Sequence, residues 1–364
     1  MVSIDLNGDV RGTVDPNLPE DVAPVRPDEQ MDWPRLEAWL RTHVPDLEGA
    51  MEVAQFPGGH ANLTYCVSFG DRELVVRRPP HGTIAPGAHD MRREYRVLSG
   101  LSPVFDRAPR VFGFCEDESV IGAPFVVIER RRGVVVRTEI PEPLASQPDV
   151  ERRLTMALVD AMVDLHRVDP KQAGLEKLGR SDGFVARQLE GWGKRWQLAT
   201  DCRNALFDEL HGKLARSMPL SRHVSIVHND FKLDNCMFDP GDPDRVQSIF
   251  DWDMATLGDP LVELGTLLSY WPRGEGGCAG SPTIALDMSA FPQRSELVER
   301  YAAGTGFDVS DLPWYEAFAL WKLAVVLQQL FRRFETGQSG DQRYARFADA
   351  IPQLLEETRV VLSG

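Results

Sequence analysis

The chain has 364 residues with a formal net charge of −15, and 43% of the residues are hydrophobic and 26% charged. The length suits two lobes that fold together, and the acidic charge disfavours nucleic acid or an anionic membrane as the main partner. No apolar run approaches the roughly 18 residues that a membrane span requires, and the first residues lack the pattern of a secretory signal. Five scattered cysteines without a C-x-x-C pair favour the cytoplasm over a disulfide framework or a zinc site.

The N-terminal third of the sequence is predicted to be rich in β-strands. Residues 1–30 are polar and are predicted to form a loosely held leader, and Asp32 can cap the helix that follows. Over residues 51–78, apolar and polar residues alternate around a Gly70-Asp71 turn, which predicts an antiparallel sheet of at least three strands. A helix over residues 89–101 and two strands, near 110–115 and 124–129, complete this part.

The rest of the chain is predicted to be mainly helical. Apolar residues recur at helical spacing from about residue 150 and again near the C-terminus. Two short strand-like runs, 224–227 and 246–250, interrupt the helices, and Asp259-Pro260 supplies the N-cap and first residue of another helix. Residues 271–292 are rich in Gly, Pro and Ser and predict a long loop. The sequence therefore predicts an α+β fold with a small antiparallel β N-lobe, residues 31–132, and a larger α-helical C-lobe, residues 133–364.

The run His228-Asn-Asp230-Phe-Lys232-Leu-Asp-Asn235 carries the strongest chemical signal in the chain. It matches the catalytic-loop pattern H-x-D-φ-K-x-x-N, where φ is apolar, and Asp251 follows after a hydrophobic strand. Phosphoryl transfer needs a carboxylate that accepts the hydroxyl proton, a cation at the transferred group and oxygen ligands for magnesium. The pattern assigns Asp230 as the base, Lys232 as the cation, and Asn235 and Asp251 as metal ligands. A surface loop would also place Asp and Asn at turns, but Lys232 and the spacing to Asp251 favour the catalytic interpretation.

Several residues near these motifs are predicted to be structural. His166 is expected to pack in the core, His228 to pack beneath the catalytic loop, and Asp259 to cap a helix. Asp253 is equally suited to be a further metal or substrate contact or a cap. Three tryptophans could line an acceptor pocket, but at helical spacing they are more often core residues: Trp271, Trp314 and Trp321.

A second group of residues, in the N-terminal part, is suited to hold a nucleotide. The glycines Gly58 and Gly59 lie between two predicted strands and let backbone N–H groups approach phosphates, and Asn62 follows them. Arg77 on a later strand can grip phosphates and pair with Glu94 on the following helix, as a strand cation and a helix acid do in kinase-like folds. The alternative is a surface ion pair.

Together these motifs resemble the aminoglycoside phosphotransferase-like family, which includes choline, homoserine and fructosamine kinases. The likeness extends over roughly residues 35–340. It is strongest to the branch whose members occur alone in bacteria or fused to acyl-CoA dehydrogenases. Three runs carry it: Leu74-Val-Val-Arg-Arg-Pro-Pro80, Val227-His-Asn-Asp-Phe-Lys-Leu-Asp-Asn235 and Phe250-Asp-Trp-Asp-Met-Ala-Thr-Leu-Gly-Asp-Pro260.

The resemblance implies a protein-kinase-like fold that uses ATP and Mg²⁺, with the backbone of a linker from Glu129 to Arg131 meeting the adenine. Two positions depart from the family pattern. Asn229 stands where the family has Gly, and its side chain is expected to point away from the site. Arg77 stands where many relatives have Lys; Arg keeps the charge and offers bidentate phosphate contacts, which leaves the choice between ATP and GTP open.

The sequence thus predicts an ATP- and magnesium-dependent kinase that acts on a hydroxyl group of a small molecule. The resemblance allows amino-sugars, choline-like amino-alcohols and hydroxyacyl-CoA thioesters; the branch favours the last, whereas the acidic net charge favours a cationic acceptor. A nucleotide-binding pseudokinase scaffold is the alternative, and only Arg77 supports it. A metal-dependent hydrolase built on His228, Asp230, Asp251 and Asp253 is less favoured, because it lacks the further ligands that a two-metal site needs.

Overall fold

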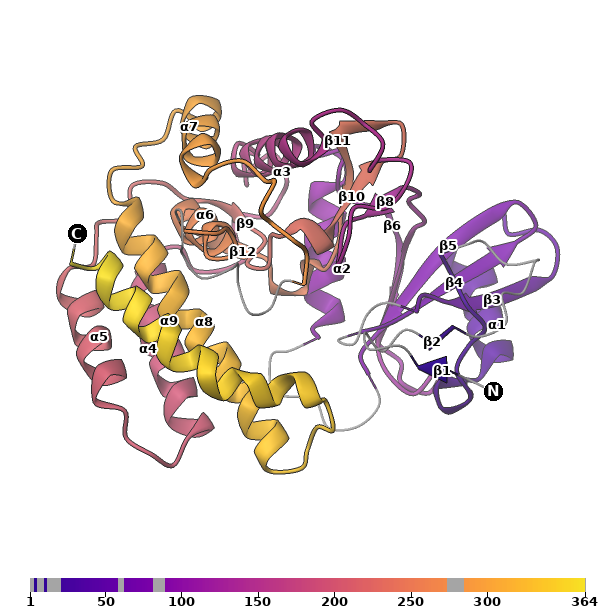
Figure 1. Ribbon diagram of the computed structural model, residues 1–364. Coiled ribbons are helices and arrows are strands. Elements are labelled where there is room, and N and C mark those ends of the chain that lie inside the picture. The colour runs from indigo at the N-terminus through magenta and orange to yellow at the C-terminus, as the bar shows by residue number, and fades with distance from the viewer. Residues whose placement is uncertain are drawn as a thin grey trace. The chain divides into compact units, whose positions relative to one another are not determined.

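The computed structural model of the chain describes residues 3–4, 10–11, 21–57, 62–80, 89–273 and 285–363 (Figure 1). The chain divides into two compact units. Unit 1 is Met1–Arg132 together with Phe250–Ala255, and unit 2 is Gly133–Ile249 together with Thr256–Gly364. In the part of the chain that the structure describes, no helix has both the length and the apolar character needed to cross a membrane.

A five-stranded antiparallel sheet with the order β3-β4-β5-β7-β6 forms the centre of unit 1. One face of β4, with Tyr65, Val67 and Phe69, is buried against Leu36 and Leu40 of the first helix. This alternation of apolar and polar residues is what a half-buried strand requires. The elements of unit 1 are β1 (Ser3–Ile4), β2 (Val10–Arg11), α1 (Trp33–His43), β3 (Met51–Gln55), β4 (Leu63–Phe69), β5 (Arg72–Arg78), α2 (Met91–Leu101), β6 (Val111–Cys115) and β7 (Phe125–Glu129).

The start of unit 1 differs from the expected loosely held leader over residues 21–30. Ala23 pairs with Gln55 as an isolated antiparallel bridge, and Val22 is buried beside Ala54. The hydroxyl of Tyr65 donates to the backbone carbonyl of Glu29 at 3.0 Å. The prediction from polar composition was therefore wrong for this segment, which is held to the sheet by backbone hydrogen bonds. The cap of α1 is as predicted, because Asp32 accepts a hydrogen bond from the backbone N–H of Arg35.

The segment 250–255 belongs to unit 1 because it packs against α2. It contains the short 3₁₀ turn η3 (Trp252–Met254). Trp252 is fully buried and meets the ring of Phe105 edge to face. Arg93 of α2 donates to the carbonyl of Ala255 at 3.4 Å. These contacts fix the position of Asp251, directly before the turn, with respect to the sheet of unit 1.

Unit 2 is mainly helical, and its longest helix, α8, runs beside α9 (Figure 1). Trp314 and Trp321 of α8 are buried, as is Trp271, so the predicted core role of these tryptophans is confirmed. The elements of unit 2 are β8 (Val134–Val135), α3 (Val150–His166), α4 (Phe184–Ala199), α5 (Ala205–Arg216), β9 (Ser225–Val227), η2 (Leu233–Asn235), β10 (Cys236–Asp239), β11 (Asp242–Ile249), β12 (Thr256–Gly258), α6 (Pro260–Leu268), α7 (Arg294–Thr305), α8 (Leu312–Glu335) and α9 (Phe347–Val361).

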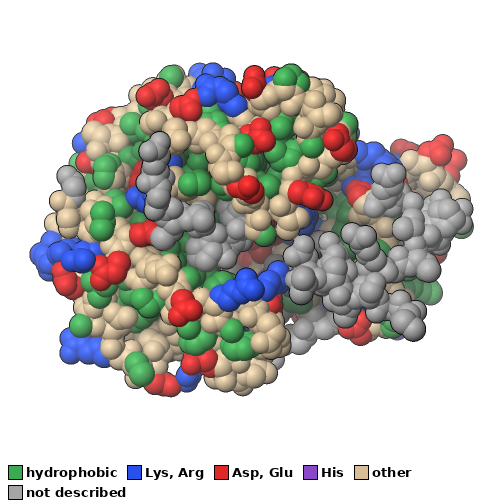
Figure 2. All heavy atoms as spheres, viewed as in Figure 1, with side chains coloured by type: hydrophobic (Ala, Val, Ile, Leu, Met, Phe, Trp, Pro, Cys, Tyr) green, Lys and Arg blue, Asp and Glu red, His purple; other side chains and the backbone are tan. Residues whose placement is uncertain are grey.

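Two small sheets interrupt the helices of unit 2, with the orders β11-β10-β8 and β12-β9. Cys236 pairs with Ile249, and Val227 pairs with Thr256. The strands β9 and β11 were predicted, whereas β8, β10 and β12 were not. These three strands are too short to show the alternation of apolar and polar residues by which a strand is recognised. Of the predicted 271–292 loop, residues 274–284 lie outside the described residues. On the face drawn in Figure 2, acidic and basic side chains of unit 2 are interspersed.

Candidate active site

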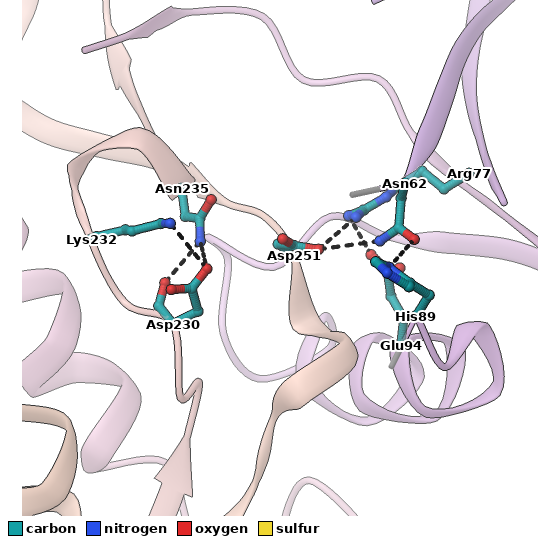
Figure 3. Close-up of polar contacts among 8 residues, drawn as sticks. All are labelled: Asn62, Arg77, His89, Glu94, Asp230, Lys232, Asn235 and Asp251. Carbon is teal, nitrogen blue, oxygen red and sulfur yellow. Dashed lines mark hydrogen bonds and ion pairs between the residues drawn. The ribbon is translucent and has the colours of Figure 1, made fainter. Parts of the chain in front are cut away.

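Three of the predicted site residues, Asn62, Glu94 and Asp251, gather around the guanidinium of Arg77, on strand β5 (Figure 3). Nη1 of Arg77 lies 2.6 Å from Oε1 of Glu94 on α2, and Nη2 lies 2.7 Å from Oδ1 of Asp251. Arg77 is buried and Glu94 has no exposed surface. The predicted pairing of strand cation and helix acid is therefore present as a buried contact, and one guanidinium bridges two carboxylates.

The electrostatics of this cluster are set by burial and by the sharing of a single cation. Burial raises the pKa of Glu94 to about 7, even though Arg77 opposes that shift. Burial also disfavours the charge of Arg77, but Glu94 and Asp251 outweigh it and raise the pKa of the guanidinium above its ordinary value. Arg77 therefore stays charged, and the raised pKa of Glu94 means that the cluster disfavours a second negative charge beside Asp251. A divalent cation bound beside Asp251 would favour the ionised form of both carboxyl groups.

Asn62 extends the cluster from the start of β4. Its Nδ2 lies 3.5 Å from Oδ1 of Asp251, and its Oδ1 lies 2.9 Å from Nδ1 of His89 (Figure 3). His89 was not among the predicted site residues, since a lone His before a helix carries no pattern of its own. The predicted phosphate-binding glycines, Gly58 and Gly59, lie outside the described residues.

The predicted adenine-binding linker follows β7. Glu129 accepts the backbone N–H of Arg110, and its own N–H donates to the carbonyl of Arg110 at 2.8 Å. The guanidinium of Arg131 lies 3.0 Å from the Glu129 carboxylate and donates to the carbonyl of Asp106. The side chains of the two predicted residues thus pair with each other.

The catalytic-loop residues of unit 2 lie between β9 and β10. Nδ2 of Asn235, at the end of η2, donates to Oδ2 of Asp230 at 2.9 Å and to the carbonyl of Asp230 at 2.8 Å (Figure 3). Nζ of Lys232 lies 3.3 Å from Oδ2 of Asp230 and 3.6 Å from Oδ2 of Asp234. His228 is fully buried beneath the loop, as predicted, and its Nδ1 accepts the backbone N–H of Asp230 at 3.3 Å. One carboxylate oxygen is thus held by an amide and an ammonium group.

Lys232 is positively charged in this loop at neutral pH. Burial disfavours its charge, but Asp230 and Asp234 outweigh burial and raise the pKa of the ammonium group above its ordinary value. Tyr270, after α6, is affected by the same carboxylate: burial first, and then Asp230, raises the pKa of its phenol. Tyr270 therefore remains protonated and able to donate a hydrogen bond close to Asp230.

Asn229 adopts a left-handed backbone conformation, with φ of 68°. This conformation is unfavourable for most side chains, but Gly adopts it freely and Asn tolerates it better than other residues. The departure from the family's Gly is therefore explained by backbone geometry. The expectation that the side chain merely points away from the site missed this requirement.

A buried network behind the loop holds Asn229 in place. The backbone N–H of Asn229 donates to Oε1 of Glu263 at 2.6 Å, and Oε2 of Glu263 lies 2.9 Å from Nε2 of His166. Nδ1 of His166 in turn lies 2.7 Å from the hydroxyl of Tyr301. Burial disfavours the charge of Glu263, but hydrogen bonding and the charge of His166 outweigh it, so the pKa of Glu263 is lowered. His166 is a hydrogen-bonded core residue, as predicted.

Glu263 was missed by sequence reasoning. It is the one charged residue within α6, a helix whose residues are all buried and, apart from Thr266, otherwise apolar. A buried charge in such a helix needs partners, which is the signal that could have found it. Asp259 caps the same helix, as predicted, by accepting the backbone N–H of Leu261 at 2.9 Å, and the hydroxyl of Tyr315 donates to its other oxygen at 2.7 Å.

The donor chemistry of each predicted metal ligand fits magnesium. Among the described residues there is no group of three or more His, Cys, Asp and Glu side chains that could hold a metal ion alone. Asn235 and Asp251 offer amide and carboxylate oxygens, which are hard ligands. Magnesium usually takes one or two such protein ligands and completes its shell with substrate phosphates and water. The few ligands present therefore match a metal that arrives with a nucleotide.

Comparison with known proteins identifies the relatives of the chain. The sequence model described as "Phosphotransferase enzyme family" matches residues 52–318. Acyl-CoA dehydrogenase family member 11 of Rattus norvegicus is 30% identical over 357 residues, covering 95% of this chain and 45% of the rat protein. The chain spans 30 to 45% of the length of the curated relatives that it matches.

Solved structures with the same fold confirm the predicted fold class. The crystal structure of a candidate aminoglycoside phosphotransferase from Ralstonia eutropha is 28% identical with a TM-score of 0.78, and the match covers 92% of this chain and 99% of that one. An aminoglycoside phosphotransferase in complex with GDP and kanamycin is 16% identical with a TM-score of 0.57, and the match covers 89% and 98% of the two chains. The second likeness concerns the fold alone.

Proposed function

Given that the chain belongs to the phosphotransferase enzyme family, we propose that it is an ATP- and magnesium-dependent kinase of small molecules. The observation that carries the proposal is the loop of unit 2, where the carboxylate of Asp230 contacts both the amide of Asn235 and the ammonium group of Lys232. Phosphoryl transfer relies on such a set of positioned polar groups and needs little covalent chemistry from the protein.

Asp230 is the proposed base. The hydroxyl oxygen of the acceptor forms a bond to the γ-phosphorus of ATP while the bond from that phosphorus to the β–γ bridging oxygen breaks. The hydroxyl proton passes to Asp230, and ADP leaves with the bridging oxygen. Asn235 and Lys232 orient the carboxylate through its Oδ2 atom, and Lys232 also offsets the negative charge of the transferred group.

Asn235 and Asp251 are the proposed magnesium ligands. When bound, the metal neutralises charge on the nucleotide phosphates. Arg77 and Asn62 hold Oδ1 of Asp251 in one orientation, so the carboxylate is ordered before the nucleotide binds.

The nucleotide is proposed to bind to residues of unit 1. Arg77 and Glu94 order the phosphate-binding side through their buried ion pair, and the linker after β7 meets the adenine. The relative solved with GDP carries a nucleotide on the same fold, which supports a nucleotide site. Whether this chain prefers adenine or guanine nucleotides is left to be measured. The proposed residues are Gly58, Gly59, Asn62, Arg77, Glu94, Glu129 and Arg131.

The acceptor is proposed to be a small molecule with a free hydroxyl group. The curated relatives named as acyl-CoA dehydrogenase family members support a hydroxyacyl-CoA thioester. The relative solved with kanamycin supports an amino-sugar, and an amino-alcohol is the remaining class. All three present an alcohol to the same base, so the class does not change the chemistry of Asp230.

A screen of ATP consumption tests the proposal. Purified protein with MgATP is offered amino-sugars, amino-alcohols and hydroxyacyl-CoA thioesters, and ADP release is followed by a coupled assay. Thermal unfolding with and without MgATP is measured alongside, because a ligand that binds only the folded state raises Tm.

The two readouts separate the kinase from its rivals. Acceptor-dependent ADP release together with stabilisation by MgATP is the expected result. Stabilisation by nucleotide without turnover on any acceptor would indicate a pseudokinase scaffold. Phosphate release from a phosphorylated compound without ATP, together with tightly bound zinc, would indicate a hydrolase and contradict the proposal.

A further inference from the structure

Two cations of unit 2 meet on the ring of one tryptophan. Trp192 of α4 is buried, and the guanidinium carbon of Arg195 lies 4.2 Å from the centre of its ring. Nζ of Lys322, on α8, lies 5.4 Å from the same ring centre. Helices α4 and α8 pack against each other, so this arrangement follows from the packing of the unit.

Neither cation has an acidic partner in the described part of the chain. No carboxylate of those residues lies within ion-pair distance of Arg195 or Lys322, whereas Lys194, on the same helix as Arg195, pairs with Glu190. Arg195 is exposed and can be solvated, but Lys322 is half-buried on α8. A half-buried ammonium group next to a like charge is unfavourable unless something else offsets it.

Lys322 lies on α8, which packs against α6, and Glu263 of α6 accepts the backbone N–H of Asn229, the residue before Asp230, at 2.6 Å. Burial lowers the pKa of its ammonium group; Asp230 and Glu263 act to raise that pKa, and Arg195 acts to lower it. Asp230 is thus among the charges that favour the ammonium form of Lys322.

We propose that Lys322 and Arg195 bind an anionic group, a carboxylate or a phosphate, on the acceptor whose hydroxyl is presented to Asp230. This inference rests on the proposed kinase function and selects among its acceptors. An anionic acceptor gains two charge-assisted contacts here, and the indole of Trp192 offers an apolar wall beside them. A polycation such as an aminoglycoside, or a quaternary amine such as choline, would instead be repelled by both side chains.

The competing explanation is that the two cations only stabilise the packing of α4 on α8 through the indole ring. The two roles differ in what they predict. A packing role affects stability alone, whereas a binding role affects the Michaelis constant of the acceptor and the stabilisation that an anionic ligand provides.

The test uses matched probes that differ in charge. The full-length protein with MgATP is offered glycerol 3-phosphate against glycerol, 3-hydroxybutyrate against 3-hydroxybutyramide, and 3-hydroxybutyryl-CoA, with kanamycin and choline as cations. The variants are Lys322→Met, Lys322→Arg and Arg195→Met. Lys194→Met serves as the control, because Lys194 is an exposed neighbour on α4 that pairs with Glu190. Turnover and the shift in Tm caused by each probe are both recorded.

The binding role predicts that an anionic member of a pair is preferred over its neutral partner. Lys322→Met should raise KM for that acceptor about 10- to 100-fold, as expected for a lost charge-assisted hydrogen bond, with KM for ATP unchanged. Lys322→Arg should bring KM for the anionic acceptor most of the way back to the wild-type value, and Lys194→Met should behave as wild type. The shift in Tm caused by the anionic probe should disappear in Lys322→Met.

Two outcomes overturn the inference while leaving the kinase intact: preferred turnover of kanamycin or choline, or an unchanged KM and probe-induced Tm shift in Lys322→Met. Equal stabilisation of wild type by the charged and neutral member of every pair also overturns it. A wild-type protein that MgATP does not stabilise contradicts the kinase proposal instead, whatever the charged probes do.

Discussion

Replacing Glu263 with Gln tests how the buried network supports the catalytic loop. Glu263 is 2% exposed and accepts the Asn229 N–H at 2.6 Å, with Nε2 of His166 at 2.9 Å from its other oxygen. The substituted amide keeps the shape but loses the charge, and one end turns from acceptor to donor. A neutral His166 with its proton on Nδ1 can accept from that donor through Nε2, so both contacts survive in neutral form.

The expected cost follows from the difference between charged and neutral hydrogen bonds. A hydrogen bond to a charged group contributes about 1.5–3 kcal/mol and a neutral one about 0.5–1.5 kcal/mol. Weakening two contacts should therefore cost about 2–3 kcal/mol of unfolding free energy. At about 2–4 °C per kcal/mol for a unit of this size, Tm should fall by about 4–12 °C.

The stability difference between wild type and Glu263→Gln should depend on pH in a defined direction. The pKa of Glu263 in the folded protein is lowered from its ordinary value of 4.5. The stability that its charge contributes is therefore fully present above about pH 4.5 and is lost as pH falls through the lower folded-state value. The difference in Tm between wild type and Glu263→Gln should be largest near pH 7 and should shrink below about pH 4.5.

The assay combines calorimetry at several pH values with steady-state kinetics. Because Asn229 precedes the base, a shift of the loop should lower kcat by about 10- to 100-fold with ATP affinity nearly intact. Asp259→Asn is the matched control, since Asp259 is a buried carboxylate that caps α6 and contacts Tyr315 rather than the loop. The control should lose stability without losing kcat. A Tm difference that stays constant with pH, or a normal kcat in Glu263→Gln, would refute the reasoning.

Three further predictions concern the loop and the Arg77 cluster. Arg77→Met leaves Glu94 and Asp251 without their shared cation and should cost about 3–5 kcal/mol; adding Glu94→Gln should recover part of this loss in urea unfolding, and no recovery would contradict the buried ion pair. Asn229→Gly should change stability by less than about 0.5 kcal/mol, whereas Asn229→Val should lower it by about 1–2 kcal/mol because φ is positive; equal effects would contradict the backbone argument. Asp251→Asn should abolish most of the rise in Tm caused by MgATP, measured by thermal unfolding, and an unchanged rise would exclude Asp251 as a metal ligand.

The catalytic loop could be predicted from sequence because its contacts are local. Asp230, Lys232 and Asn235 stand within six residues of one another, so the spacing alone brings their side chains together. The Arg77–Glu94 contact spans 17 residues. It was predictable only because a strand followed by a helix is a recurring arrangement in kinase-like folds.

The supporting contacts could not be predicted because they depend on tertiary packing. Glu263 meets Asn229 across 34 residues, and Tyr301 meets His166 across 135. Hydrophobic periodicity identifies the buried face of a helix but does not say which residue that face meets. The bridge between Ala23 and Gln55 was not predicted for a related reason. Backbone pairing of a polar segment requires no particular side chains, so the composition of the segment does not indicate it.

The central claim is that Asp230 accepts the proton of the acceptor hydroxyl, and Asp230→Asn tests it most directly. The substitution preserves the shape of the side chain but removes the base, whose loss typically lowers turnover by about 10²- to 10⁴-fold. Isothermal titration with MgATP and steady-state kinetics on the identified acceptor should therefore show a kcat reduced to that extent and a nearly unchanged nucleotide affinity. An Asp230→Asn protein with full turnover would contradict the mechanism.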